Sequence, residues 1–206
     1  MARKFKLNKS ELTRLRRDEK IYLQFLPVLK LKQEQLQIEQ LKLRRELQAR
    51  AEAFEQARAA AASMISLLPE PLPLSVRDLV KAQELVIGEK SVAGVRVPTL
   101  ERVVFPSLRV SRFGNPPWVL RALPRLRTFV QLNTEIAILN EQYRLIGHEL
   151  RKATQKVNLF EKVLIPETKE AVRRIKIALG DQQVAAVCRG KIAKGKQQAA
   201  AAAAAV

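Results

Sequence analysis

The sequence predicts an all-α protein, built as a long antiparallel two-helix coiled coil with a small mixed insert that contains a β-hairpin. Two long segments repeat apolar residues every three or four positions, and a proline-rich, β-branched stretch separates them. The composition agrees, because the 206 residues include only 7 glycines and 5% aromatic residues, and they are rich in Ala, Leu, Lys, Glu and Gln.

Residues 1–66 form the first predicted helix. Apolar residues recur every seven positions along it and form the seam that would face a partner helix. Leu26, Leu47 and Phe54 belong to the second row of this seam, three residues before or four residues after the first row. Polar Glu19 and Gln33 interrupt this second row, so the seam is imperfect. Taken from Lys9 to Ser66, at about 1.5 Å per residue, this helix would be roughly 87 Å long. The seam residues are Leu15, Tyr22, Leu29, Leu36 and Leu43.

Residues 67–116 form the predicted insert. The run "LLPEPLPL" ends the first helix, because three prolines remove backbone donors and disfavour helical geometry before them. A short helix is expected at 75–83. The β-branched stretches "ELVIGEKSVAGVRVP" and "LERVVFPSLRV", with Gly88, Gly94 and Pro98 as breaks, are then interpreted as a small β-hairpin.

Residues 117–180 form the second long helix, whose apolar steps of three and four run without a miss for eleven positions. The two helices are similar in length, so they should fold back on each other, each burying the seam of the other. The seam residues include Leu132, Ile136, Leu139, Tyr143, Leu150, Val157, Phe160 and Leu164.

Pro166 interrupts this second helix at a change of register. Beyond Leu164 the apolar positions become Thr168, Val172, Ile175 and Leu179, which adds one step of four, a stutter. A new helix starting there would have isoleucine as its N-cap, a poor choice. We therefore expect one continuous helix that is bent near Pro166.

Residues 181–206 form a basic and alanine-rich tail that we expect to be disordered or a fraying helix. Lys and Arg outnumber Asp and Glu by 38 to 20, a net charge of +18, and the two ends of the chain are richest in basic residues. In an antiparallel hairpin both ends lie together, so this charge would be concentrated. An acidic partner surface is implied.

Catalytic constellations are hard to find in this sequence. His148 is the only histidine, Cys188 has no identifiable catalytic partner, and no glycine-rich phosphate loop occurs. We therefore expect no catalytic residues, no cofactor and no metal site. Without a signal peptide or a long uncharged apolar run, the chain is interpreted as soluble and intracellular.

Three stretches resemble the D subunit of V-type rotary ATPases, most closely its bacterial branch. They are "NKSELTRLRRDEKIYLQFLPVLKLKQEQL", "SVAGVRVP" and "TQKVNLFEKVLIPETKEAVRRI". The third carries the family hallmark, and Gln155-Lys156 stands where many members have two or three basic residues. The motif residues are Val157, Asn158, Glu161, Leu164, Ile165 and Pro166.

The resemblance implies a non-catalytic central-stalk rotor shaft. Its expected partners are a ring of catalytic A and nucleotide-binding B subunits, a small F subunit and a membrane-side socket subunit. The chain would be cytoplasmic and peripheral to the membrane, and the insert would protrude toward the F subunit and the socket. A basic coiled-coil nucleic-acid-binding or scaffold protein is the alternative. Expected ring contacts are Arg3, Lys4, Lys6, Arg14, Arg16, Arg17, Arg189 and Lys191.

Overall fold

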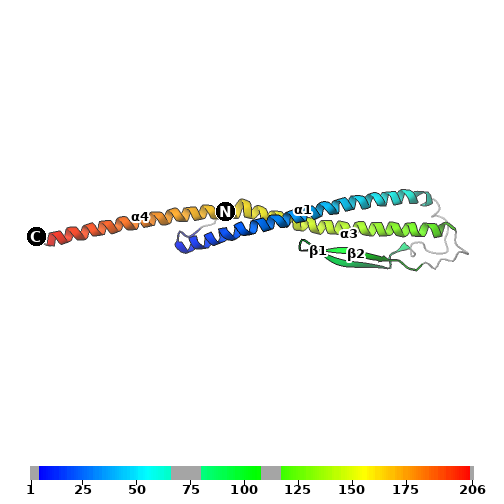
Figure 1. The fold of residues 1–206 in the computed structure, drawn as a ribbon, viewed down its shortest axis with the longest axis horizontal. Helices are drawn as coiled ribbons and strands as arrows, with labels where there is room; N and C mark the ends of the chain where they lie inside the picture. The colour runs from blue at the N-terminus through cyan, green and yellow to red at the C-terminus, as the bar shows by residue number, and fades with distance from the viewer. Residues whose placement is uncertain (1–4, 66–79, 108–116, 205–206) are drawn as a thin grey trace. The chain divides into compact units, whose positions relative to one another are not determined.

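The computed structural model describes residues 5–65, 80–107 and 117–204. It confirms the predicted fold class of two long antiparallel helices with a β-hairpin between them in the sequence (Figure 1). The predicted proline break, most of the short helix at 75–83, and Arg3 and Lys4 lie outside the described residues. In chain order the elements are α1 (Lys9–Ile65), β1 (Glu84–Val92), β2 (Val95–Val104), α3 (Pro117–Leu159), the π-helical turn η1 (Phe160–Leu164) and α4 (Ile165–Ala204).

The chain divides into two compact units, which are described separately. Residues 32–153 form the first, named here the strand unit because it contains β1 and β2. Residues 1–31 and 154–206 form the second, named the terminal unit because it contains both chain ends. Helices α1 and α3 each contribute residues to both units.

The core of the strand unit joins three elements. Leu36 and Leu43 of α1 pack with Ile146 of α3 and with Val95 and Val97 of the hairpin. The helices run antiparallel. Later positions on α1 meet earlier positions on α3: Arg50 pairs with Glu135, and the rings of Phe54 and Phe129 lie 4.2 Å apart between centroids. The hairpin therefore adds a third layer to the two-helix seam.

The predicted hairpin turns at Ala93 and Gly94, and Gly94 is one of the three residues that the sequence marked as breaks in the β-branched region. Both residues have positive φ, 50° and 78°, as the two central residues of a tight type I′ turn require. Pro98 lies within β2 and pairs with Glu89, and the register shifts between Val86 and Ile87. In a two-stranded sheet each strand is an edge, where proline is tolerated.

The core of the terminal unit joins two helices. Leu15 of α1 packs with Ala171, Val172 and Ile175 of α4, and Phe5, Leu12 and Leu179 cover this cluster. The carboxamide oxygen of Asn8 accepts a hydrogen bond of 2.8 Å from the Glu11 N–H, which satisfies a free donor at the start of α1.

The extra step in the second seam occurs at η1, where the turn is wider than an α-helical one. The Ile165 N–H donates to the Phe160 carbonyl, a bond that spans five residues, and the flanking φ and ψ values stay helical. Val157 and Ile165 are both buried, eight positions apart instead of seven. One extra residue is thus absorbed as a π turn, and Pro166 follows it without ending the helix.

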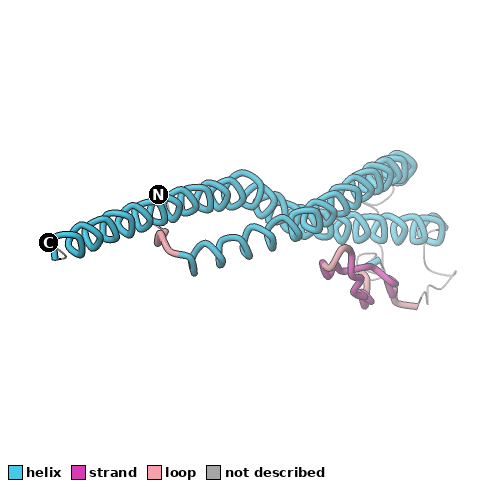
Figure 2. Tube along the Cα trace, turned by 60° about the vertical axis from the view of Figure 1, so that its left-hand side comes forward, coloured by secondary structure: helices cyan, strands magenta, loops and turns pink. Residues whose placement is uncertain are grey.

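Helix α4 continues to Ala204, beyond the end at residue 180 that we expected (Figure 2). Side chains from 181 to 198 are all exposed. Alanine, lysine and glutamine have high helix propensity, and this explains why the segment is helical although its large apolar side chains, Val184, Val187 and Ile192, stay exposed. Within the described part of the chain, the tail is therefore a single, unpaired extension of α4.

Candidate functional site

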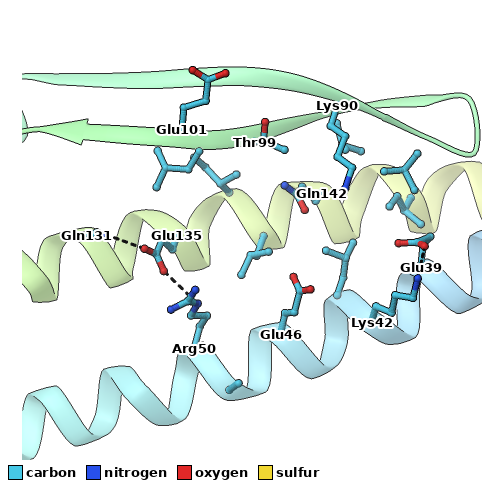
Figure 3. Close-up of a pocket in the computed structure, with 18 of the residues that line it drawn as sticks. Glu39, Lys42, Glu46, Arg50, Lys90, Thr99, Glu101, Gln131, Glu135 and Gln142 are labelled. Carbon is cyan, nitrogen blue, oxygen red and sulfur yellow. Dashed lines mark hydrogen bonds and ion pairs between the residues drawn. The ribbon is translucent and has the colours of Figure 1, made fainter.

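The strand unit contains a groove with a volume of about 750 Å³. It lies between α1, α3 and the hairpin (Figure 3). Its apolar floor includes Leu43, Val97, Leu139 and Ile146. A concave apolar surface of this kind can bind side chains of another protein.

Charged residues of α1 and α3 form the wall of this groove. The Arg50 Nε lies 3.2 Å from Glu135 Oε2, and the Gln131 side chain donates to Glu135 Oε1 at 3.1 Å. Even so, Glu135 Oε2 is buried without a well-aligned hydrogen bond. Figure 3 shows Glu46 extending from α1 into the space between the helices. The residues that line the groove thus include carboxylates but no nucleophile paired with a base.

One polar contact fastens the hairpin to α3. The Gln142 side chain donates a hydrogen bond of 2.6 Å to the Pro98 carbonyl. Pro98 lies on β2, so this bond fixes the position of the strand against the helix. Sequence patterns alone gave no sign of it, because glutamine is common on exposed helix faces.

The structure places the predicted seam residues in two groups. Leu15, Leu36, Leu43 and Val157 are buried, whereas Tyr22, Leu29, Leu132, Ile136, Leu139, Tyr143, Leu150, Phe160 and Leu164 are half-buried. In a two-helix pair each seam residue keeps one side toward solvent, which explains the large half-buried group.

The motif residues of 157–166 have distinct surroundings. Phe160 meets Tyr22 edge to face, with centroids 5.3 Å apart, and Glu161 binds Lys30 at 2.8 Å. Both contacts join η1 to α1 within the terminal unit. They place the π turn against α1. Of the remaining motif residues, Ile165 is buried, Leu164 is half-buried, and Asn158 and Pro166 are exposed.

The basic residues predicted to contact a ring are exposed where the structure describes them. Arg14 lies 3.8 Å from Glu11 and 3.9 Å from Asp18, and Arg189 donates to the Ala185 carbonyl. Arg14, Arg16 and Arg17 sit near the start of α1, and Arg189 and Lys191 sit on the unpaired end of α4. Both groups belong to the terminal unit. Lys6 is exposed just before α1.

Two carboxylates on α3 have a pKa below the ordinary value of glutamate. A hydrogen bond from Arg144 lowers the pKa of Glu141, and a hydrogen bond from Lys152 lowers the pKa of Glu149, with smaller contributions from the charges of Lys152, His148 and Lys32. Both are exposed pairs one helical turn apart. They stabilise the helix surface and carry no sign of acid-base chemistry.

Within the described residues, no group of three His, Cys, Asp or Glu side chains could hold a metal ion. No helix in the described ranges is long and apolar enough to cross a membrane. The candidate functional sites in the described residues are therefore binding surfaces: the groove, the motif at η1 and the basic ends.

Comparisons with known proteins point to one family. The family described as the ATP synthase D subunit matches residues 11–195. The V-type ATP synthase D subunit of Borreliella burgdorferi is 34% identical over 187 residues, covering 91% of this chain and 92% of the relative. The same-named protein of Chlamydia felis is 32% identical over 181 residues, covering 87% and 84%. That of Chlamydia muridarum is 33% identical over 187 residues, covering 89% and 91%.

Proposed function

The chain belongs to the ATP synthase D-subunit family, and from this premise we propose that it is the central-stalk shaft of a V-type ATPase. In this role it contributes no catalytic residue. It couples ATP turnover in a ring of catalytic A and nucleotide-binding B subunits to ion movement, by rotating inside the ring.

The observation that carries this proposal is the unpaired extension of α4. The paired core of the terminal unit ends near Leu179, but α4 continues to Ala204 with exposed basic residues. A single, unpaired helix can enter a narrow channel, and its positive charge favours an acidic lining. A shaft tip has these properties.

Asymmetry supports the same role. Three equivalent clefts can respond differently to a shaft only if the shaft presents different faces to them. The hairpin is packed on the helix pair of the strand unit and makes that unit asymmetric. We propose that this unit faces the small F subunit and the membrane-side socket, so that the chain reaches the membrane only through the complex.

Co-purification tests the proposal. A tagged chain expressed with the A, B and F subunits should bring down all three, and nuclease treatment should change nothing. Removal of residues 189–206 should weaken rotation-coupled ATP hydrolysis while binding to the F subunit persists. Loss of F-subunit binding in this truncation would contradict the placement of the tip in the ring.

A nucleic-acid-binding or scaffold role is the second candidate, because the net charge is +18. Binding of this kind would depend on phosphate contacts, so affinity would fall steeply as salt rises. The purified chain would then carry ultraviolet absorbance at about 260 nm that nuclease removes. Ring binding that resists nuclease distinguishes the two roles.

A further inference from the structure

One flank of the terminal unit exposes a stripe of large apolar side chains. Ile21, Phe25 and Val28 of α1 are spaced by four and three residues, so they share one face of the helix. Their exposed fractions are 45%, 55% and 61%. We name this stripe the Phe25 flank. Contiguous apolar surface of this kind is typical of interaction sites.

A hollow of about 330 Å³ lies on the same side of α1 as the Phe25 flank. Arg14 and Asp18 line it together with Leu164 and Glu167 of the second helix. Residues seven apart occupy the same position in a coiled coil, so Ile21 follows Arg14 and Phe25 follows Asp18 on the same side. The Phe25 flank therefore continues the hollow along α1.

The second helix also exposes a large apolar side chain just before the π turn. Leu159 is 47% exposed and lies five residues before Leu164, which lines the hollow.

The opposite flank of the same unit is different. Leu23 is also 46% exposed, but two positions along a helix turn it about 200° away from both Ile21 and Phe25. Lys30, seven residues further along α1, lies on the same side of the helix as Leu23, and its ammonium group binds Glu161 at 2.8 Å. An ion pair therefore spans the two helices on the Leu23 side, whereas apolar side chains and a hollow occupy the Phe25 side.

The charges around the hollow define what fits there. Its floor includes Phe5, Leu15 and Tyr22, and its wall carries three carboxylates, Glu11, Asp18 and Glu167, against one guanidinium. Glu11 and Asp18 are 21% and 33% exposed and share Arg14, which is 72% exposed. In a chain of net charge +18 this wall is locally acidic. Phosphate groups would be repelled here, and a lysine or arginine would be attracted.

We propose that the Phe25 flank docks a segment of one subunit of the catalytic ring, whose apolar side chains cover Ile21, Phe25 and Val28. A lysine or arginine of that segment enters the hollow and binds Glu167 and Asp18. The inference rests on the proposed function, since it names the face of the shaft that contacts the ring. One flank of the shaft then binds the ring and the opposite flank, which carries the ion pair, does not. The strength of the contact between shaft and ring therefore depends on the rotation angle of the shaft.

The first experiment compares the two flanks. The double variant Ile21→Ser/Phe25→Ser and the control Leu23→Ser are titrated onto purified ring, and affinity is measured by interferometry. The double variant should bind at least about tenfold more weakly, and Leu23→Ser should bind like the wild type. Equal affinity for all three proteins, or an equal loss in the control, overturns the proposal. All the substituted side chains are exposed, so the unfolding transition should be unchanged.

The second experiment tests the cation in the hollow. Glu167→Lys should weaken ring binding at low salt, and high salt should reduce the difference from the wild type because the contact is electrostatic. Glu170→Lys, one helical turn away and paired with Arg174, is the control and should have no such effect. Wild-type affinity for Glu167→Lys overturns the assignment of a cationic group. If the wild-type chain itself does not bind the ring, the proposed function fails instead.

Discussion

The two units bury their apolar residues in different ways. In the strand unit the hairpin covers the helix pair, and Val97 of β2 is only 2% exposed. Among the described residues of the terminal unit two helices meet, and Phe5 covers their shared core. Two helices can bury a single stripe on each, so any further apolar residue stays at the surface.

This difference indicates which unit needs another protein to cover its exposed apolar residues. The strand unit supplies its own third layer, and its remaining groove has a charged wall. The described residues of the terminal unit supply no third layer, and this is the unit that exposes Ile21 and Phe25 and extends the unpaired end of α4. We expect its missing layer to come from the ring.

The largest expected effect comes from truncating one buried residue in each unit. Leu36 and Ile175 are both 0% exposed. Leu36→Ala should cost about 3–5 kcal/mol and Ile175→Ala about 2–3 kcal/mol, because a two-helix core can collapse more fully around a cavity. Urea unfolding followed by circular dichroism measures both. A larger loss for Ile175→Ala would contradict the comparison, and exposed Leu41→Ala is the control.

Pro166→Ala sharpens the account of the π turn. Proline in a helix interior costs about 3 kcal/mol, but the wide turn before it separates its ring from the preceding carbonyls. We expect the substitution to stabilise the chain by about 1–2 kcal/mol. The π turn should persist, since the eight-residue spacing of Val157 and Ile165 requires the extra residue. A crystal structure with a regular α-helix at 160–164 would refute this explanation.

A pair of glycine substitutions should act in opposite directions in the two units. Gly94 has φ of 78° in the hairpin turn, so Gly94→Ala should destabilise the strand unit by about 1 kcal/mol. Gly180 lies in α4 with open space around its Cα, so Gly180→Ala should stabilise the helix by about 0.5–1 kcal/mol. Thermal unfolding measures both. Shifts of the same sign would contradict these two backbone conformations.

The smallest effect concerns pH. Lys152 lowers the pKa of Glu149, so this pair stabilises the folded helix above the unfolded pKa of glutamate, and the contribution is lost as pH falls through the lower folded value. Lys152→Gln should move the pKa of Glu149 back up, as followed by nuclear magnetic resonance titration. Glu141, which is held by Arg144, should not change and serves as the internal control.

Periodicity predicted the helices well. Apolar residues spaced by three and four positions fall on one face of a helix, and few other structures would bury them all. Helices α1 and α3 lie in the two segments whose periodicity predicted long helices. The stutter at Pro166 indicated a local disturbance, which the structure describes as a π turn. The predicted bend there stays a prediction.

Other features depend on information that the pattern does not contain. Gly94 marked the turn in the sequence, but Ala93 did not, because alanine rarely adopts positive φ. The ion pairs of Lys30 with Glu161 and of Arg50 with Glu135 join residues far apart in sequence. Their partners follow from the antiparallel register, which only the folded chain sets. For the tail the sequence left two alternatives, disorder or a fraying helix, and the structure describes a helix to Ala204.

Direct observation of rotation is the most decisive test of the shaft proposal. A bead is attached to a cysteine introduced at Glu101, which is exposed on the hairpin, in a Cys188→Ser background. The ring is fixed to a surface and ATP is added. The account predicts that the bead turns in one direction and stops when ATP is exhausted. ATP hydrolysis by the assembled complex with a stationary bead would contradict it.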